Sequence, residues 1–453
     1  MPRMSPARAV WQTLPAMPEP PALHAIRGPA LTFTGDPFVE GVEATLDYER
    51  DAIVGFTDGK ISHFGPAARV RSELPPGTHI EEYGQDSLIL PGFIDAHVHY
   101  PQTQIIGAYG EQLLDWLTKY TFVAEQQFAD AAHARAVAEF FLDECLRHGT
   151  TTMATFCTVH AHSVDAFFEA AGKRGLRTIA GKCLMDRNAP DALRDSAKRG
   201  YDESKALIQR WHGKGRASYA ITPRFAPTST PEQMELAGAL WKEHPGTYLQ
   251  SHVAENRAEV TWAQEIFPER NGYLDIYDHF GQLGPRAIYG HGIWLTESEL
   301  ARMHESGTAI AHCPTSNQFL GSGLFDLRKA KLPGRPLRVG LATDVGAGTS
   351  LSMLKTMGAA YEVAQLGGGS LSAPLAFYLA TRGAAQALYL EDKIGSIAVG
   401  MEADLIVLDL KSTPLIEFRM RHCASLEDAL FVQMTMADER AVVSIFVAGD
   451  KKA

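Results

Sequence analysis

Eight apolar segments that alternate with stretches of helical periodicity place the strongest constraint on how this chain can fold. Each segment is rich in apolar or β-branched residues, which is typical of buried strands. The eight segments are Leu88–His97, Thr150–Phe156, Arg177–Cys183, Ser218–Phe225, Tyr248–His252, Ala287–His291, Thr308–His312 and Val339–Thr343. Amphipathic stretches typical of helices lie between them, at 131–148, 163–174, 192–211, 231–244 and 296–306. Alternating strands and helices predict a parallel sheet with helices packed against it.

The number of strand–helix units selects one architecture among the α/β folds. Eight units over roughly 300 residues match a (β/α)8 TIM barrel, which takes about 250 residues or more. A doubly wound sheet would carry a G-x-G-x-x-G phosphate turn after a strand, and none of the eight segments is followed by that motif. We therefore predict a catalytic TIM barrel at residues 88–394.

The two ends of the chain differ from this core. Residues 26–87 and 395–453 contain short strand-like segments with turn signals, such as Ala52–Phe56 before the turn Thr57-Asp58-Gly59-Lys60. Because both ends have this pattern, we predict one small β-sandwich domain formed from the two termini together. Residues 1–25 are rich in proline and alanine and are expected to be a poorly ordered lead-in.

Composition excludes several classes of protein. The formal net charge is −11 and the basic residues are dispersed, which argues against a nucleic-acid binder. No apolar run reaches the roughly 18 residues of a membrane span, and the N-terminal region lacks a secretory signal pattern. The five cysteines form no C-x-x-C pair, so we expect reduced thiols in a cytoplasmic protein. The H-x-E and P-C-x-x-C signature of zinc deaminases with the cytidine-deaminase fold is also absent.

A His-x-His motif at the end of the first predicted strand is a candidate metal site. His97 and His99 are two residues apart, so both imidazoles lie on the same side of the strand. There they would point into the barrel mouth, where the active sites of TIM barrels lie. The motif alone is weak, because the chain has 17 histidines and a second copy at His160 and His162. That copy lies beyond the end of a strand, so we do not interpret it as a metal site, although His160 could lie at the border of the active site.

Three residues at the ends of other strands strengthen the metal prediction. His252 ends the fifth strand, His291 ends the sixth and Asp344 follows the eighth. Each alone is better explained as a hydrogen-bonded core residue or a loop cap, but together they point to one face of the barrel. Three neutral imidazoles and one carboxylate suit Zn²⁺ or Fe²⁺ and leave a position for water. A metal held in this way lowers the pKa of its water to about 7.

The number of metals follows from the position of a lysine. Two-metal barrels of this kind usually place a bridging modified lysine on the fourth strand. Here the fourth strand carries Thr222-Pro223-Arg224-Phe225, and Lys182 is on the third. We therefore predict one metal per chain and a structural role for Lys182.

Glu255 is the candidate proton shuttle, because it lies three residues after His252. From there it can reach the metal-bound water and pass a proton to a ring nitrogen and then to a leaving amine. The alternative interpretation is an ordinary solvated glutamate, which is how we interpret the neighbouring Glu259.

Several segments together carry a family resemblance. PGFIDAHVH, SHVAEN, GHG, AHCPTSN and GLATDVG resemble the amidohydrolase superfamily, in its branch of metal-dependent deaminases of aromatic rings. DWLTKYTFVAE (115–125), GKCLMD (181–186), ITPRFAPT (221–228), QSHVAENRAEV (250–260) and TSNQFLGSG (315–323) are similar to segments of members that deaminate guanine. The resemblance covers nearly the whole chain. One departure is Val123, where that family's pattern has proline.

The resemblance implies a reaction and a role for each site residue. The reaction is the hydrolytic deamination of guanine to xanthine and ammonia by a metal-activated water. It implies that one Zn²⁺ (or Fe²⁺) binds His97, His99, His252 and Asp344. It also implies that Gln102, Arg224, Phe225 and Glu255 contact the purine, beside the ligands His252 and Asp344, and that Glu255, His291 and Asp344 act in catalysis. Trp116 and Tyr120 are candidates either for lid aromatics or for core packing, and a homodimer is expected because such barrels are often dimers.

Two alternatives remain at this stage. The substrate could be a related ring such as 8-oxoguanine, a pterin or a triazine, and Arg224, Phe225 and the 115–125 segment are the features that discriminate. A catalytically inactive scaffolding homologue would have lost metal ligands, whereas this chain has all four and also His291.

Overall fold

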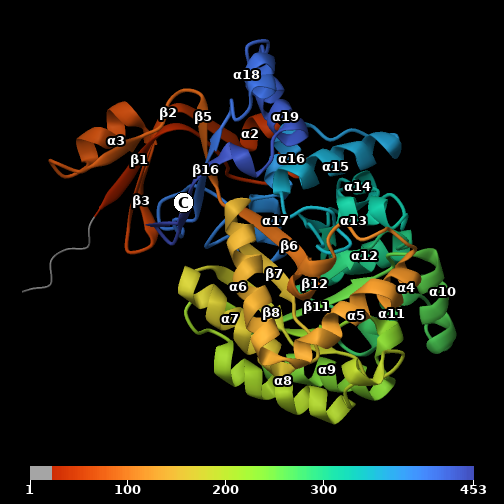
Figure 1. Cartoon of the computed structure of the whole chain (residues 1–453). Coiled ribbons are helices and arrows are strands. Elements are labelled where there is room, and N and C mark those ends of the chain that lie inside the picture. Colours follow the sequence, from red (N-terminus) through yellow and green to blue (C-terminus); the bar gives the residue numbers. More distant parts are fainter. Residues whose placement is uncertain (1–22, 453) are drawn as a thin grey trace, which may run out of the picture.

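The computed structural model describes residues 23–452, which form two β-sheets with helices around one of them (Figure 1). The larger sheet is a parallel barrel whose neighbouring strands follow chain order, with β14 lying against β6. Its strands are β6 (Phe93–His99), β7 (Thr150–Phe156), β8 (Arg177–Gly181), β10 (Ala217–Pro223), β11 (Tyr248–Val253), β12 (Ala287–His291), β13 (Ala309–His312) and β14 (Arg338–Leu341), and the short β9 (Cys183–Leu184) pairs with β10. The predicted TIM barrel is confirmed.

Helices that follow the barrel strands form its outer layer (Figure 1). The principal ones are α6 (Ala131–Arg147), α7 (Ala161–Arg174), α8 (Ala197–Trp211), α9 (Pro231–Glu243), α10 (Arg257–Ile266), α11 (Tyr273–His279), α12 (Glu297–Ser306), α15 (Met353–Leu366), α16 (Ala373–Leu379) and α17 (Arg382–Ala387). Their apolar faces pack on the strands, as α6 does through Phe141 and Leu142. None of the helices in the described part of the chain is long and apolar enough to cross a membrane.

The second sheet combines strands from both ends of the chain, as the sequence predicts. Its hydrogen-bonded order is β17-β16-β15-β5-β1-β2-β3, and β4 pairs with β1. The strands are β1 (His24–Phe33), β2 (Leu46–Thr57), β3 (Lys60–Pro66), β4 (Ile80–Glu82), β5 (Ser87–Pro91), β15 (Leu405–Asp409), β16 (Val442–Val447) and β17 (Asp450–Lys451). The remaining α-helices of the described residues are α1 (Pro37–Glu40), α2 (Val42–Thr45), α3 (Ala67–Glu73), α4 (Leu113–Trp116), α5 (Phe122–Gln126), α13 (Pro314–Phe319), α14 (Leu327–Ala330), α18 (Pro414–Met420) and α19 (Leu426–Met436).

The prediction of one strand over Leu88–His97 is wrong, because the structure divides this segment between the two sheets. β5 pairs antiparallel with β15 in the terminal sheet, whereas β6 belongs to the barrel. Gly92 joins them, and a Cβ at this position would lie 2.2 Å from Oγ1 of Thr151, so only glycine fits. Apolar residues continue on both sides of the break, and the dipeptide Pro91-Gly92 is the local turn signal that marks it.

The N-terminal prediction also needs a correction. β1 begins at His24 and pairs with β2 from its first residue, so the strand extends into the segment expected to be a poorly ordered lead-in. Residues 1–22 lie outside the described part of the chain.

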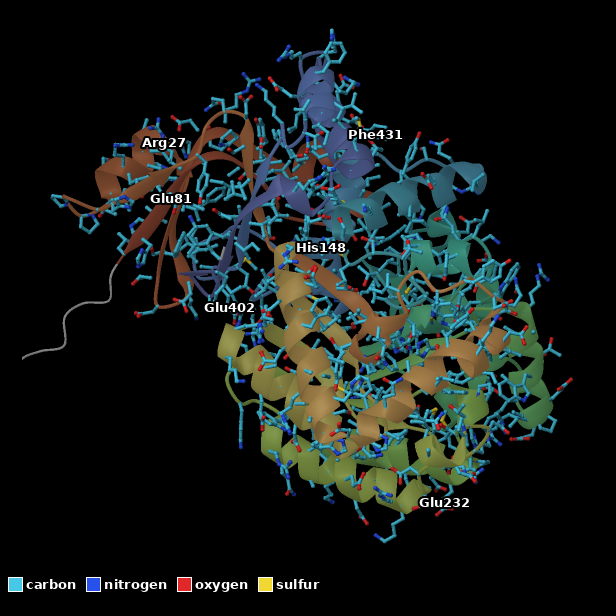
Figure 2. All side chains as sticks on the ribbon, viewed as in Figure 1. Arg27, Glu81, His148, Glu232, Glu402 and Phe431 are labelled. Carbon is cyan, nitrogen blue, oxygen red and sulfur yellow. The ribbon has the colours of Figure 1, made fainter. Side chains whose placement is uncertain are left out.

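A partly buried charge cluster joins the barrel to the terminal sheet. Arg216 donates to Glu402 at 2.6 Å and also pairs with Asp404, and Arg177 donates to Glu402 at 2.9 Å. Figure 2 shows Glu402 at this junction. The two arginines come from the β8–β10 region of the barrel, so these pairs hold the barrel against β15.

Candidate active site

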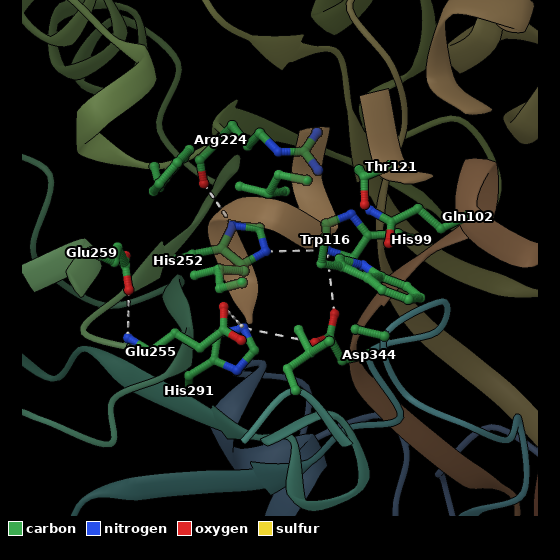
Figure 3. A pocket seen from close by; sticks show the side chains of 15 residues that line it. His99, Gln102, Trp116, Thr121, Arg224, His252, Glu255, Glu259, His291 and Asp344 are labelled. Atoms are coloured by element: carbon green, nitrogen blue, oxygen red, sulfur yellow. Dashed lines mark hydrogen bonds and ion pairs between the residues drawn. The ribbon is translucent and has the colours of Figure 1, made fainter. Parts of the chain in front are cut away.

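Five of the predicted residues converge at the carboxyl ends of the barrel strands, and Figure 3 shows His99, His252, His291 and Asp344 of this group. The Nε2 atom of His99 lies 3.2 Å from Nε2 of His97 and 3.1 Å from Nε2 of His252. Oδ1 of Asp344 lies 3.4 Å from the Nε2 atoms of both His97 and His99. His291 also belongs to the cluster, since its ligand atom and those of His97, His252 and Asp344 lie within 4.8 Å of one another.

The protonation states of this cluster suit metal binding. Burial lowers the pKa of His99 to about 3 and holds the pKa of His252 well below its usual value. Burial acts to raise the pKa of Asp344, but hydrogen bonds with His97 and His99 bring it well below its ordinary range. Neutral imidazoles beside an ionised carboxylate are the forms that coordinate a metal.

Hydrogen bonds to the outer ring nitrogens orient two of the histidines. Nδ1 of His252 lies 2.6 Å from the carbonyl oxygen of Arg224, and Nδ1 of His291 lies 2.8 Å from Oδ1 of Asn317. Each Nδ1 therefore donates, which leaves Nε2 of each ring with a lone pair directed into the site.

The backbone around the cluster is specialised for this convergence. His291 and Asp344 adopt left-handed φ angles of 76° and 50°, which turn the chain where the strands end. Asp95 joins β6 to the end of β14, because it accepts hydrogen bonds from the backbone N–H groups of His97 and Thr343, at 3.2 and 3.0 Å. Gly290 lies so close to the ring of His97 that a Cβ there would be 2.9 Å from Cε1 of the ring.

Glu255 lies beside the cluster with a raised pKa. Its Oε2 is 3.3 Å from Nε2 of His291, and its Oε1 accepts a hydrogen bond of 2.9 Å from the hydroxyl of Ser322. Burial, followed by the neighbouring Asp344, raises the pKa of Glu255 to about 8. A carboxyl group in this state carries a proton at neutral pH.

The interpretation of Glu259 as a solvated glutamate is wrong. Its side chain is fully buried and accepts hydrogen bonds from the backbone N–H groups of Glu255 and Asn256, at 2.8 and 3.0 Å, and from the hydroxyl of Tyr273 at 2.6 Å. It occupies the third helical position of α10 and completes a capping box with Asn256. Glu259 thereby fixes the backbone that carries Glu255.

A pocket opens next to the cluster and contains the residues expected to contact the substrate. Gln102, Arg224 and Phe225 line it together with His252, Glu255 and Asp344. Figure 3 shows Arg224 on one side of His252, and Glu255 and His291 on the other.

The 109–125 segment covers part of this pocket. α4, one π-helical turn (Leu117–Thr121) and α5 follow one another, and Trp116, Leu117 and Thr121 line the pocket. Val123, the departure from the family pattern, points away from the site with 53% of its surface exposed. Tyr120 is half-buried and packs on Trp116.

The structure keeps Lys182 and the second His-x-His motif away from the pocket. Lys182 is fully buried and forms ion pairs with Asp195 and Glu203, so it has the structural environment that the sequence predicts. His162 bonds to the carbonyl of Phe128 at 2.7 Å, and neither His160 nor His162 lines the pocket.

Residue-by-residue analysis of the sequence missed four residues that support the site. Asp95, Glu125, Asn317 and Ser322 each bond directly to a predicted site residue or to the backbone beside it. All four fall within segments that carry the family resemblance, which was the available signal. That signal does not say which residue of a segment faces the site.

Comparison with known proteins now identifies the family. The model of the amidohydrolase family matches residues 88–451. This chain belongs to the amidohydrolase family. This amidohydrolase is 46% identical to guanine deaminase of Escherichia coli K12 over 430 residues, which cover 94% of this chain and 97% of that protein.

Solved structures give the same relationship. The E. coli guanine deaminase structure superposes with a TM-score of 0.92 and 45% identity, covering 95% of this amidohydrolase and 99% of that chain. A guanine deaminase from C. acetobutylicum with bound guanine in its active site superposes with a TM-score of 0.85 and 27% identity, covering 95% and 100%. The resemblance found in the sequence is confirmed.

Proposed function

We propose that this amidohydrolase catalyses the hydrolytic deamination of guanine to xanthine and ammonia. The observation that carries the proposal is one pocket, which is lined both by members of the His/Asp cluster (His99, His252, His291 and Asp344) and by Gln102, Arg224 and Phe225. Close relatives over nearly the full chain bear the name guanine deaminase, and one of their structures contains guanine. The proposed substrate is therefore the free purine base.

The residues of the cluster fit one divalent metal ion. Nε2 of His99 lies 3.2 Å from Nε2 of His97 and 3.1 Å from Nε2 of His252, so the three ring nitrogens are close enough to bind one cation together. We propose His97, His99, His252 and Asp344 as the ligands of one Zn²⁺, with Fe²⁺ as the second choice. When bound, such a metal supplies Lewis acidity and lowers the pKa of a bound water to about 7.

Glu255 and His291 have the proton-handling roles in the proposal. With its raised pKa, Glu255 can donate its proton to N3 of the ring; the resulting carboxylate then accepts a proton from the attacking water and delivers it to the departing amino group. His291 lies between Glu255 and Asp344, at 3.3 and 3.7 Å, and orients the attacking water together with Asp344.

Arg224, Gln102 and Phe225 have the recognition roles. Arg224 is a donor only, so it can hydrogen-bond the O6 carbonyl of guanine but opposes the amino group of adenine. Gln102 pairs with a ring edge, and Phe225 packs on the purine face. A buried polar site of this kind rejects an analogue with the wrong group by about 10⁴- to 10⁵-fold.

An ammonia-release assay tests the substrate. We expect efficient turnover of guanine and little of adenine or cytosine. A preference for 8-oxoguanine, a pterin or a triazine would overturn the substrate while leaving the metal site intact. Arg224→Ala should raise KM and lower kcat/KM without loss of metal. Arg187→Ala is the matched control, because Arg187 is half-buried and does not line the pocket.

Three further predictions from the sequence stay as proposals. They are a homodimer, a cytoplasmic location, and a division into a terminal β domain (26–87 with 395–453) and a barrel (88–394), except that β5 up to Pro91 belongs to the terminal sheet.

A further inference from the structure

The carboxylate of Glu125 has no role in the reaction proposed above, yet it bonds to two of the proposed recognition residues. It lies in α5 with 1% of its surface exposed. Nη1 of Arg224 donates to Oε1 and Oε2 of Glu125 at 2.9 and 2.8 Å, and Nε2 of Gln102 donates to Oε1 at 3.3 Å. One carboxylate therefore joins α5, the end of β10 and the turn after β6.

Glu125 lies behind the pocket wall. Gln102 and Arg224 line the pocket and Glu125 does not, so a ligand meets the two donors and not the carboxylate. The carboxamide of Gln102 is fixed at both ends, because Nε2 bonds to Glu125 and Oε1 accepts from the backbone N–H of Gly346 at 3.4 Å. Glu125 engages only Nη1 of Arg224, so its carboxylate does not use all five N–H donors of the guanidinium.

The same contact decides the charge of this side of the pocket. Arg224 is 3% exposed and Glu125 is its buried counterion. Burial acts to lower the pKa of Arg224, but the carboxylate of Glu125 raises it above its ordinary value, so the guanidinium stays charged. The pair is neutral as a whole, so Arg224 presents hydrogen-bond donors without an uncompensated positive charge.

We propose that Glu125 is a positioning and specificity residue that orients Arg224 and Gln102 and cancels the charge of Arg224. The pocket then favours a neutral 6-oxopurine over an anionic one. This inference rests on the proposed function, since it concerns recognition of guanine and release of xanthine, which ionises more readily than guanine.

The first test compares Glu125→Gln with Glu111→Gln. Glutamine keeps the shape of Glu125 but removes its charge. Glu111 is the matched control, because it forms an ion pair with Lys119 in the same segment and does not line the pocket. We expect Glu125→Gln to lower kcat/KM for guanine by about 10- to 100-fold, mainly through KM, with unchanged metal content. Glu111→Gln should match the wild type.

The second test separates recognition from simple structural support. At alkaline pH, where xanthine is an anion, Glu125→Gln should bind xanthine about tenfold more tightly than the wild type by calorimetry, because Arg224 is then uncompensated. A merely structural role would weaken guanine and xanthine alike. In an Arg224→Gln background, Glu125→Gln should have little further effect on guanine.

The outcomes distinguish the inference from the proposed function. If the wild type releases no ammonia from guanine, the proposed function fails. If the wild type is active but Glu125→Gln behaves like Glu111→Gln, or weakens both ligands equally, the inference about Glu125 is overturned and the proposed function stands.

Discussion

Gly290→Ala should weaken metal binding through a single added methyl group. Gly290 lies in β12 directly before His291, outside the left-handed φ region, so the backbone accepts alanine. The added Cβ would lie 2.9 Å from Cε1 and 3.2 Å from both nitrogens of the His97 ring. Ordinary contact begins at 3.4 Å, so the ring must withdraw by about 0.5 Å.

The size of this displacement decides the expected result. A metal–ligand distance can deviate from its ordinary value by about 0.2 Å. Because the ring of His97 must move by more than that, it can no longer coordinate the metal from its present position. We expect metal affinity to fall by about 10- to 100-fold, with an overpacking cost of about 1–3 kcal/mol in the free energy of unfolding.

A chelator titration that follows bound metal and guanine deamination together measures the effect. Gly172→Ala in α7 is the matched control, because a Cβ there meets nothing within 4 Å and alanine favours a helix. Excess Zn²⁺ should restore part of the activity of Gly290→Ala. Wild-type metal affinity and kcat/KM in Gly290→Ala would refute the reasoning and the placement of His97 at the metal.

The remaining predictions concern the metal, the proton shuttle and pH. Elemental analysis should find close to one metal per chain, and His97→Ala or Asp344→Ala should lose metal and activity together; two equivalents would contradict the mononuclear site. Glu255→Gln should lower kcat by about 10²- to 10⁴-fold at unchanged metal content, and a variant retaining most of its kcat would exclude Glu255 as the shuttle. Burial raises the pKa of Glu259 to about 7 in the folded chain from an ordinary 4.5, so its contribution to stability is complete below about pH 4.5 and is lost as pH rises toward 7. Denaturant titrations should find that the free energy of unfolding decreases by about 3 kcal/mol over that pH range, and Glu259→Gln should abolish the decrease. If the free energy of unfolding of the variant still falls with pH in the same way, the pH dependence belongs to another group.

The sequence was a reliable guide wherever the signal is local. The barrel strands follow from apolar runs, and the histidines of the H-x-H motif follow from the two-residue repeat of a strand. The error over Leu88–His97 has a physical reason: the end of β5 and the start of β6 are both apolar, and pairing with β15 or with β7 assigns them to different sheets. Glu259 looked like a surface residue because a capping glutamate has the same local pattern whether its helix start is exposed or buried.

The sequence by itself determined the class of fold and the set of ligand-type side chains, because strand periodicity and residue chemistry are properties of short stretches of chain. Only the tertiary structure decided which side chains meet. Glu125 reaches Arg224 across 99 residues and Asn317 reaches His291 across 26. The buried charge on Glu125 and the raised pKa of Glu255 arise from packing against distant strands and loops, since burial and counterions depend on what folds around a group.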